Sequence, residues 1–111
     1  MKYSKGDIVW VNFPFTDGSS SKIRPALVIS NEKVNVTGDY LLIQITSRVK
    51  NDNFSIEISE NDFVDENLTI RSFIRIHKIF VLNEALIISR KTSITDKFRK
   101  HVIESVFDLF T

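Results

Sequence analysis

The chain has 111 residues, which is enough for one compact domain spanning residues 1–111 and too few for a second hydrophobic core. With 42% hydrophobic and 26% charged residues, its composition is that of a folded protein. Fifteen Lys and Arg against fourteen Asp and Glu give a net charge of +1, so any polyanion site has to be local. The absence of Cys excludes disulfides, thiol nucleophiles and Cys-ligated metal centres.

No segment of the sequence is suited to membrane insertion or secretion. The apolar runs fall well short of the roughly 18 residues that a membrane-spanning helix needs. Residues 1–7 lack the apolar core of a secretory signal. We therefore expect a cytoplasmic protein with no membrane partner.

The first half of the chain predicts three strands rich in β-branched, aromatic or other apolar residues, at positions 7–13, 24–30 and 40–47. A turn-rich stretch at 14–22 separates the first two and is expected to be an exposed loop. Pro25 has no amide donor and restricts the residue before it. It therefore suits the start of a strand and keeps Arg24 extended at a loop-to-strand junction.

The second half predicts shorter strands and a terminal helix. Residues 54–59 alternate between apolar and polar, which is typical of a half-buried strand, and an acidic, turn-prone stretch follows at 60–67. Further strands are expected at positions 72–76, 78–82 and 86–89. The last segment has apolar residues at helical spacing, namely Phe98, Val102, Ile103, Val106, Leu109 and Phe110. Ser93 or Thr95 can serve as its N-cap, and residues 106–111 are expected to be packed helix.

Five to seven short strands followed by one helix predict a mainly β fold, a small and strongly bent antiparallel sheet or partly open β-barrel closed by the C-terminal α-helix. Nine Phe, one Trp and two Tyr are many aromatic residues for so small a domain, and some are expected to face a partner. A homodimer is the simplest partner. Trp10 and Phe13 are expected in the core or a dimer contact rather than as base-stacking platforms.

Several kinds of catalytic site are excluded or disfavoured by the residue pattern. The sequence has neither a nucleophile-elbow motif nor a phosphate-binding Gly-rich loop. His77 and His101 lie too far apart to form a metal-ligand motif. The acids between residues 57 and 66 lack EF-hand spacing and favour a solvated loop over a metal site.

The remaining polar residues at strand ends predict an anion site. Arg24 begins one strand, Thr46 and Ser47 end another, and Arg75 and His77 share one face of a third because strand side chains alternate. Guanidinium, hydroxyl and imidazole groups together could bind phosphate and shuttle a proton. Each residue also has an ordinary alternative: capping a turn, ending a strand, making a surface ion pair or packing against the sheet.

The sequence also resembles the MazF/PemK (Kid) type of toxin from bacterial toxin–antitoxin pairs. The likeness begins with GDIVWVNFPFTDG at 6–18 and KIRPALVIS at 22–30, and it continues through 45–47, 72–79 and the terminal helix. The resemblance implies a homodimeric, SH3-like β-barrel with a C-terminal helix. It also implies a sequence-specific, metal-independent endoribonuclease that needs no cofactor, cleaves single-stranded RNA and is neutralised by a cognate antitoxin.

The resemblance implies roles for individual residues. Arg24 matches the RP arginine of the family and Thr46 its strand-end threonine, the two positions usually held to be catalytic. Arg75 matches an arginine that some members place two residues before an acid, but His77 takes the place of that acid here. Either His77 substitutes for the acid as general base, or the roles are divided differently in this chain.

The chemistry of RNA cleavage sets what these residues would have to do. RNA carries its own nucleophile, the 2′-hydroxyl, so the protein need only align it, move a proton and stabilise charge on the phosphorane. Arg24 suits charge stabilisation because a guanidinium binds two phosphate oxygens and has a pKa above about 12. His77 suits proton transfer, since an ordinary imidazole has a pKa near 6.5.

The remaining predicted residues bind the substrate. Ser47 would act with Thr46 on a phosphate oxygen or the 2′-hydroxyl, and Arg75 and Lys22 would bind the RNA backbone. Arg48 and Lys50 would add positive charge to the same groove, which an acidic, partly apolar segment of the antitoxin would cover. The segment 19–22 could cover RNA, although its composition is equally that of a plain linker.

Two other functions fit the same fold. A toxin similar to CcdB would poison DNA gyrase without a nuclease site, and it would depend on its C-terminal residues. A catalytically silent barrel would bind nucleic acid without cleaving it. The fold alone does not distinguish these functions, so they have to be distinguished by the residues of the site.

Overall fold

The computed structural model describes residues 2–14, 21–49 and 51–111. Its strands are β1 (Asp7–Pro14), β2 (Ser21–Val28), β3 (Asp39–Thr46), β4 (Ser55–Glu57), β5 (Phe73–Asn83) and β6 (Ile87–Ser93). Its helices are α1 (Glu32–Asn35) and α2 (Asp96–Phe107), with 3₁₀ turns at Glu60–Asp62 and Glu84–Leu86.

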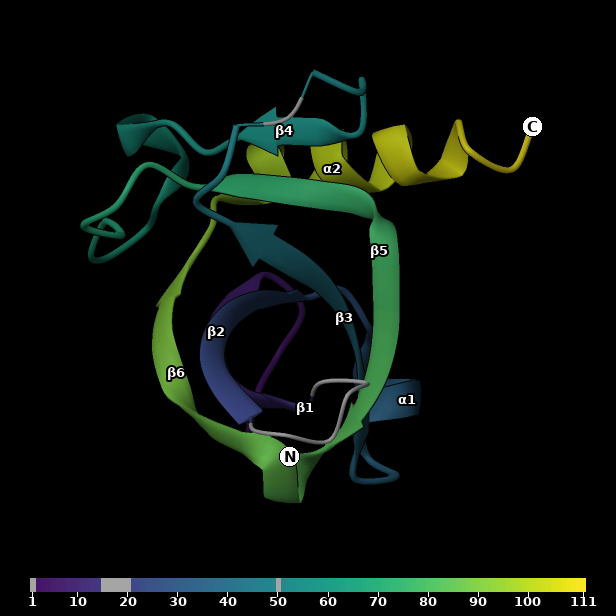
Figure 1. The fold of residues 1–111 in the computed structure, drawn as a ribbon. Coiled ribbons are helices and arrows are strands. Elements are labelled where there is room, and N and C mark those ends of the chain that lie inside the picture. The colour runs from purple at the N-terminus through teal and green to yellow at the C-terminus, as the bar shows by residue number, and fades with distance from the viewer. Residues whose placement is uncertain (1, 15–20, 50) are drawn as a thin grey trace.

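The strands form one antiparallel sheet in the order β4-β5-β3-β2-β1-β6. Figure 1 shows the sheet curling around on itself, with α2 lying across one end of the curl. The sheet is not closed, because no ladder joins its edge strands β4 and β6 in the described residues. The mainly β, strongly bent prediction is confirmed, and the barrel is an open one.

The curl of the sheet creates two hydrophobic clusters. Ile8 and Leu27 pack in the cluster that includes Phe98 and Val102 of α2. The next residue along each strand, Val9 and Val28, packs in a second cluster on the other side of the sheet. The alternation follows from the two-residue period of a strand, and it explains why β1 is apolar from residue 8 to 11 and β2 from residue 25 to 28.

Helix α2 begins where the sequence predicts. Thr95, rather than Ser93, is its N-cap and accepts a hydrogen bond from the amide of Phe98. None of the helices in the described part of the chain is long and apolar enough to cross a membrane.

The prediction that residues 106–111 form packed helix is wrong beyond Val106. The helix ends at Phe107, and the side chains of Phe107 and Phe110 are 64% and 74% exposed. Figure 1 shows the C-terminal tail running past the sheet, so there is little sheet beneath it to cover these rings. The helical spacing of apolar residues continues past the point at which the sheet can cover them, so it does not show where the packed part of the helix ends.

Other predicted boundaries also needed correction. The strands expected at 72–76 and 78–82 are one continuous strand, β5, and β6 runs on to Ser93. The predicted loop at 14–22 is shorter than expected, because β1 includes Pro14 and β2 begins at Ser21, while 15–20 lie outside the described residues. Helix α1 was not predicted; Asn31 caps it by accepting from the amide of Lys33.

Candidate functional site

Arg24 and Thr46 come from neighbouring strands and line the same surface. The β2–β3 ladder pairs Ala26 with Gln44, and continuing that antiparallel register by two residues places Arg24 opposite Thr46. Both residues line two adjoining hollows, which we call the cationic hollow and the apolar hollow. The convergence of these two residues was expected from the sequence.

The cationic hollow has a volume of about 360 Å³ and carries four positive side chains. Its lining residues are Phe13, Arg24, Gln44, Thr46, Arg48, Arg75 and Lys78. None of these is acidic, so the hollow concentrates positive charge in a protein whose net charge is only +1. Such a surface suits the phosphates of a polyanion.

An irregularity in β5 brings two of these cations to the hollow. Between the pairs Ile43–Ile79 and Ile45–Ile74, β3 advances two residues while β5 advances five. The longer path of β5 contains Arg75 and Lys78, and Figure 1 shows the strand turning a corner. Bulged strands bend and redirect their side chains, which explains how both cations reach one hollow despite their odd spacing.

Arg75 is held in a fixed direction by an acid that the sequence did not single out. Its side chain is only 10% exposed, and its Nη1 donates to Asp52 Oδ2 at 2.6 Å and to Ser55 Oγ at 2.9 Å. The hydrogen bond from Arg75 lowers the pKa of the Asp52 carboxyl. Arg75 is therefore more than the exposed surface ion pair that the sequence left open.

His77 lies beside Arg75 but lines neither hollow. Its ring packs at 4.6 Å, centroid to centroid, on Phe54, and its Nε2 is 3.5 Å from Arg75 Nη2. Desolvation lowers the pKa of His77, the charges of Arg75 and Lys78 lower it further, and Asp52 acts the other way. The neutral imidazole is thus favoured at neutral pH.

The apolar hollow, of about 270 Å³, lies on the other side of Arg24 and Thr46. Its lining residues are Trp10, Ile23, Arg24, Pro25, Ile45, Thr46, Ser47, Leu68, Thr69, Ile70, Ser72 and Lys91. Ser47 therefore accompanies Thr46, as expected. Trp10 is half-buried and lines the apolar hollow, so it belongs to a surface hollow and not only to the core.

Lys22 is not brought into either hollow. Its side chain is exposed on β2, where its backbone pairs with Phe13 of β1. Arg48 does line the cationic hollow, whereas Lys50, Ser19 and Ser20 lie outside the described residues.

Sequence reasoning missed Gln44, Asp52 and Lys78, together with the residues from 68 to 72 in the apolar hollow. Gln44 and Lys78 are polar residues within predicted strands, and only the irregular β3–β5 register shows which surface they share. Asp52 lies in a loop, and nothing in its sequence context indicates that it meets a residue 23 positions away.

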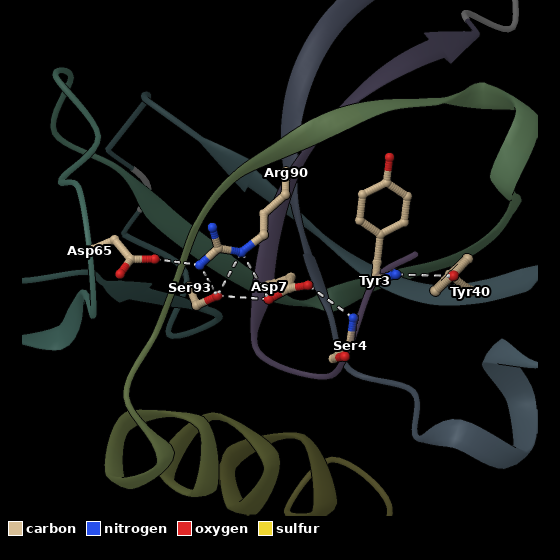
Figure 2. Close-up of polar contacts among 7 residues, drawn as sticks. All are labelled: Tyr3, Ser4, Asp7, Tyr40, Asp65, Arg90 and Ser93. Carbon is tan, nitrogen blue, oxygen red and sulfur yellow. Dashed lines mark hydrogen bonds and ion pairs between the residues drawn. The ribbon is translucent and has the colours of Figure 1, made fainter. Parts of the chain in front are cut away.

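The acidic stretch near residues 57–66 is engaged in ion pairs. Glu57 makes two hydrogen bonds with Arg71, at 2.5 and 2.9 Å, and Glu66 bonds Lys91 Nζ at 2.9 Å. Asp65 bonds Arg90 (Figure 2). In the described part of the chain, no three His, Cys, Asp or Glu side chains are grouped so that they could hold a metal ion.

The bent sheet, the terminal helix and the paired hollows define a small antiparallel β domain with a cationic surface site. Residues 4–110 match the model of the PemK-like, MazF-like toxin of type II toxin–antitoxin systems. The chain belongs to this toxin family. No match was found among curated proteins.

Solved structures support the same fold. The MazE–MazF complex (Form-III) from Deinococcus radiodurans is 20% identical, with a TM-score of 0.80 over 99% of this chain and 97% of that chain. MazF (Form-I) from the same organism is 21% identical, with a TM-score of 0.78 and the same coverage. An endoribonuclease in complex with its cognate antitoxin, from a mycobacterial species, is 12% identical, with a TM-score of 0.77 over 96% and 92% of the two chains.

Proposed function

We propose that this toxin is an endoribonuclease that cleaves single-stranded RNA at specific sequences by attack of the 2′-hydroxyl on the adjacent phosphate. The observation that carries the proposal is the position of Arg24 and Thr46 in the wall shared by the two hollows. A phosphate bound at this wall would have cations on one side and apolar groups on the other. A nucleotide needs both environments, because its phosphate is charged and its base is flat and largely apolar on its faces.

The roles follow from the chemistry of the side chains. Arg24 stabilises the charge that builds on the phosphorane, because preorganised donors act most strongly where charge develops. Thr46 and Ser47 orient the 2′-hydroxyl or a phosphate oxygen. Arg75, already aimed by Asp52, binds a neighbouring phosphate. Lys22, exposed on β2, binds the RNA backbone outside the hollows.

His77 is proposed as the proton acceptor. Its lowered pKa keeps the imidazole neutral at neutral pH, which is the form a general base requires. Its ring is next to Arg75 rather than in the hollow, so the 2′-hydroxyl and the phosphate that it attacks lie together at the Arg75 side of the cationic hollow, within reach of His77. No metal or cofactor takes part in this mechanism.

A cognate antitoxin and a second copy of the chain are the proposed protein partners. The cationic hollow suits an acidic segment that would compete with RNA, and structural relatives include MazE–MazF complexes. Large apolar side chains remain exposed, among them Val81 at 58% and Phe110 at 74%, and pairing of two chains would cover part of this surface.

The proposal is tested by incubating the purified protein with single-stranded RNA in EDTA. We expect fragments ending in 2′,3′-cyclic phosphate, and a loss of roughly 100- to 1000-fold in rate for Arg24→Ala. Lys100→Ala, which removes an exposed cation of α2 that lines neither hollow, should cleave like the wild type. Equal cleavage by wild type and Arg24→Ala would mean that a contaminating nuclease is responsible.

A second candidate function is a CcdB-like toxin that poisons DNA gyrase. It is favoured by one observation, the exposure of Phe107 and Phe110 in a tail that was expected to be packed. This function predicts inhibited supercoiling while RNA stays intact, and loss of the inhibition in Phe110→Ala. Supercoiling at the normal rate in the presence of the toxin would exclude it.

A further inference from the structure

We propose that the apolar hollow receives one unstacked nucleobase next to the scissile phosphate, and that residues 64–70, the wall segment, determine which base fits. The inference rests on the proposed function in one respect, that the ligand is single-stranded RNA. It assigns a role in base selection to the wall segment, whose residues belong to none of the sequence motifs and have no proposed catalytic role.

The position of the apolar hollow relative to the cations points to a base. Arg24 and Thr46 line both hollows, so a phosphate held there places its attached nucleoside within reach of the apolar one. Proteins read single-stranded RNA by stacking splayed bases on aromatic or apolar side chains and by bonding to base edges. The apolar hollow offers Trp10 for stacking and the hydroxyl of Thr69 for the base edge.

The lining of the apolar hollow keeps large aliphatic side chains in solvent. Ile23 of β2 is 63% exposed and Ile70 of the wall segment is 64% exposed. Leu68 lines the hollow and is half-buried. A volume of about 270 Å³, just below the roughly 300–1,000 Å³ of common small-molecule sites, suits one base better than a longer segment. A stacked base would remove these aliphatic groups from water.

The wall segment is held in place by strand β6 as well as by the core, against which Leu68 packs. The amide of Val64 donates to the carbonyl of Ser93 at 2.8 Å, and Phe63 forms an isolated bridge with Ile94. Lys91 Nζ bonds Glu66 Oε2 at 2.9 Å. These contacts fix the wall segment against a strand whose own Lys91 lines the apolar hollow.

Arg90 makes a second ion pair with the wall segment, through Asp65, and also bonds Asp7 of β1. We call these contacts of Arg90, together with the Glu66–Lys91 ion pair, the tether. Figure 2 shows its guanidinium between Asp65 on the wall segment and Asp7 and Ser93 on the strands. Ser93 Oγ also donates to Asp7 Oδ1 at 2.7 Å. Because Asp7 is only 13% exposed, the tether is anchored in the sheet and holds the wall before any ligand arrives. A preformed wall can discriminate between bases, since a poorly fitting base cannot easily displace it.

Trp10 supplies a direct readout because it is the one Trp of the chain. Four short RNAs would carry 2′-O-methyl groups, which block cleavage, and differ only in the base at one central position. We expect one base to quench Trp10 fluorescence at a concentration at least 10-fold lower than the others. Leu68→Ala and Ile70→Ala should reduce that preference by roughly 10-fold, whereas Ile88→Ala, at an exposed aliphatic position of β6 outside the hollow, should keep it.

The role of the tether in base preference is tested by exchanging the charges of its Glu66–Lys91 ion pair. Glu66→Lys and Lys91→Glu each break the pair and should weaken the base preference several-fold. The double variant restores a pair of opposite charges and should recover most of the preference. Recovery separates a positioning effect from simple attraction of RNA to an added Lys, because the double variant leaves the net charge unchanged.

The outcomes distinguish this inference from the proposed function. Quenching with a base preference but no cleavage of unmodified RNA would overturn the endoribonuclease and retain the base site. Unchanged preference in both Leu68→Ala and Ile70→Ala would overturn the base site even if the protein cleaves RNA. Quenching by an acidic, apolar-containing peptide and by none of the four RNAs would assign the hollow to a protein partner instead, which also overturns the inference.

Discussion

At the scale of single residues, the most consequential contact is that between Arg75 and Asp52. A guanidinium that is 10% exposed needs a counter-charge, because removing one partner of a buried pair leaves an uncompensated charge. The bonds to Asp52 and Ser55 use one end of the guanidinium, and its other terminal nitrogen lies 3.5 Å from His77 Nε2. Asp52 thus serves as a positioning residue for Arg75 and not as a base.

We expect Asp52→Asn to destabilise the protein at pH 7, with a stability deficit that shrinks in acid. The pKa of Asp52 lies below the ordinary value of 3.8 in the folded chain, chiefly through its hydrogen bond with Arg75. The unfolded chain therefore binds this proton more readily. The stabilisation is complete above the unfolded pKa and is lost as pH falls through the folded one. Urea unfolding at pH 7 and near pH 3 measures both values.

A matched control for this prediction is Asp108→Asn, at an exposed position that ends α2. It should change stability little at either pH. A stability gap for Asp52→Asn that stays constant between the two pH values would mean that the carboxylate charge does not hold Arg75.

The residue types of the site were partly predictable. The RP dipeptide and the strand-end hydroxyl at Thr46 are local signals, although Arg24 lies within β2 (Ser21–Val28) and not at the start of a strand, where the sequence pattern predicts it. Arg75 was identified by its spacing, but its burial depends on Asp52, which is 23 positions away in the chain. The positions of His77 and Lys78 depend on an irregular ladder that no sequence period encodes.

At the scale of elements, α2 shows which structural signals are strong in a sequence. Its start was predicted because the cap is local: Thr95 accepts from the amide three residues on. Its end was misplaced because the apolar spacing continues past the residues that have a sheet beneath them. Periodicity reports the residues that a helix could bury, while tertiary contacts decide those that it does.

Thr95→Ala should destabilise the protein by about 1 kcal/mol, since it leaves an amide of the first turn without its side-chain acceptor. For a domain of this size that loss lowers Tm by roughly 4 °C. Thr95→Ser retains the acceptor and should stay close to the wild type. Thermal unfolding followed by circular dichroism measures both, and equal Tm values for Ala and Ser would show that the cap contributes nothing.

At the scale of the whole molecule, the fold concentrates charge that the composition conceals. A net charge of +1 gives no sign of a polyanion surface, yet β2, β5 and the segment that follows β3 bring four cations around one hollow. Three of the acids, Glu57, Asp65 and Glu66, are placed elsewhere, in ion pairs of the 57–66 stretch. The bent sheet was predictable from strand patterns, but this segregation of charge depends on strand order and register, which the sequence does not reveal.

The gathering of cations in the cationic hollow predicts how RNA binding depends on salt concentration. The proposed phosphate contacts are Arg24, Arg48, Arg75 and Lys78 in the cationic hollow and Lys22 beside it. Five contacts to a single strand give a slope of log K against log salt of about −3.5, at roughly −0.7 per contact. Titrations of a fully 2′-O-methylated RNA between about 50 and 200 mM salt measure this slope.

Single variants assign the slope to the hollow. Arg48→Gln and Lys78→Gln should each make the slope less steep by about 0.7, because each removes one counterion-releasing contact. Lys100→Gln removes the same charge from the exposed face of α2 and should leave the slope unchanged. If all three variants shifted binding equally, net charge rather than the cationic hollow would control RNA affinity, and the local site inferred from β2, β3 and β5 would be wrong.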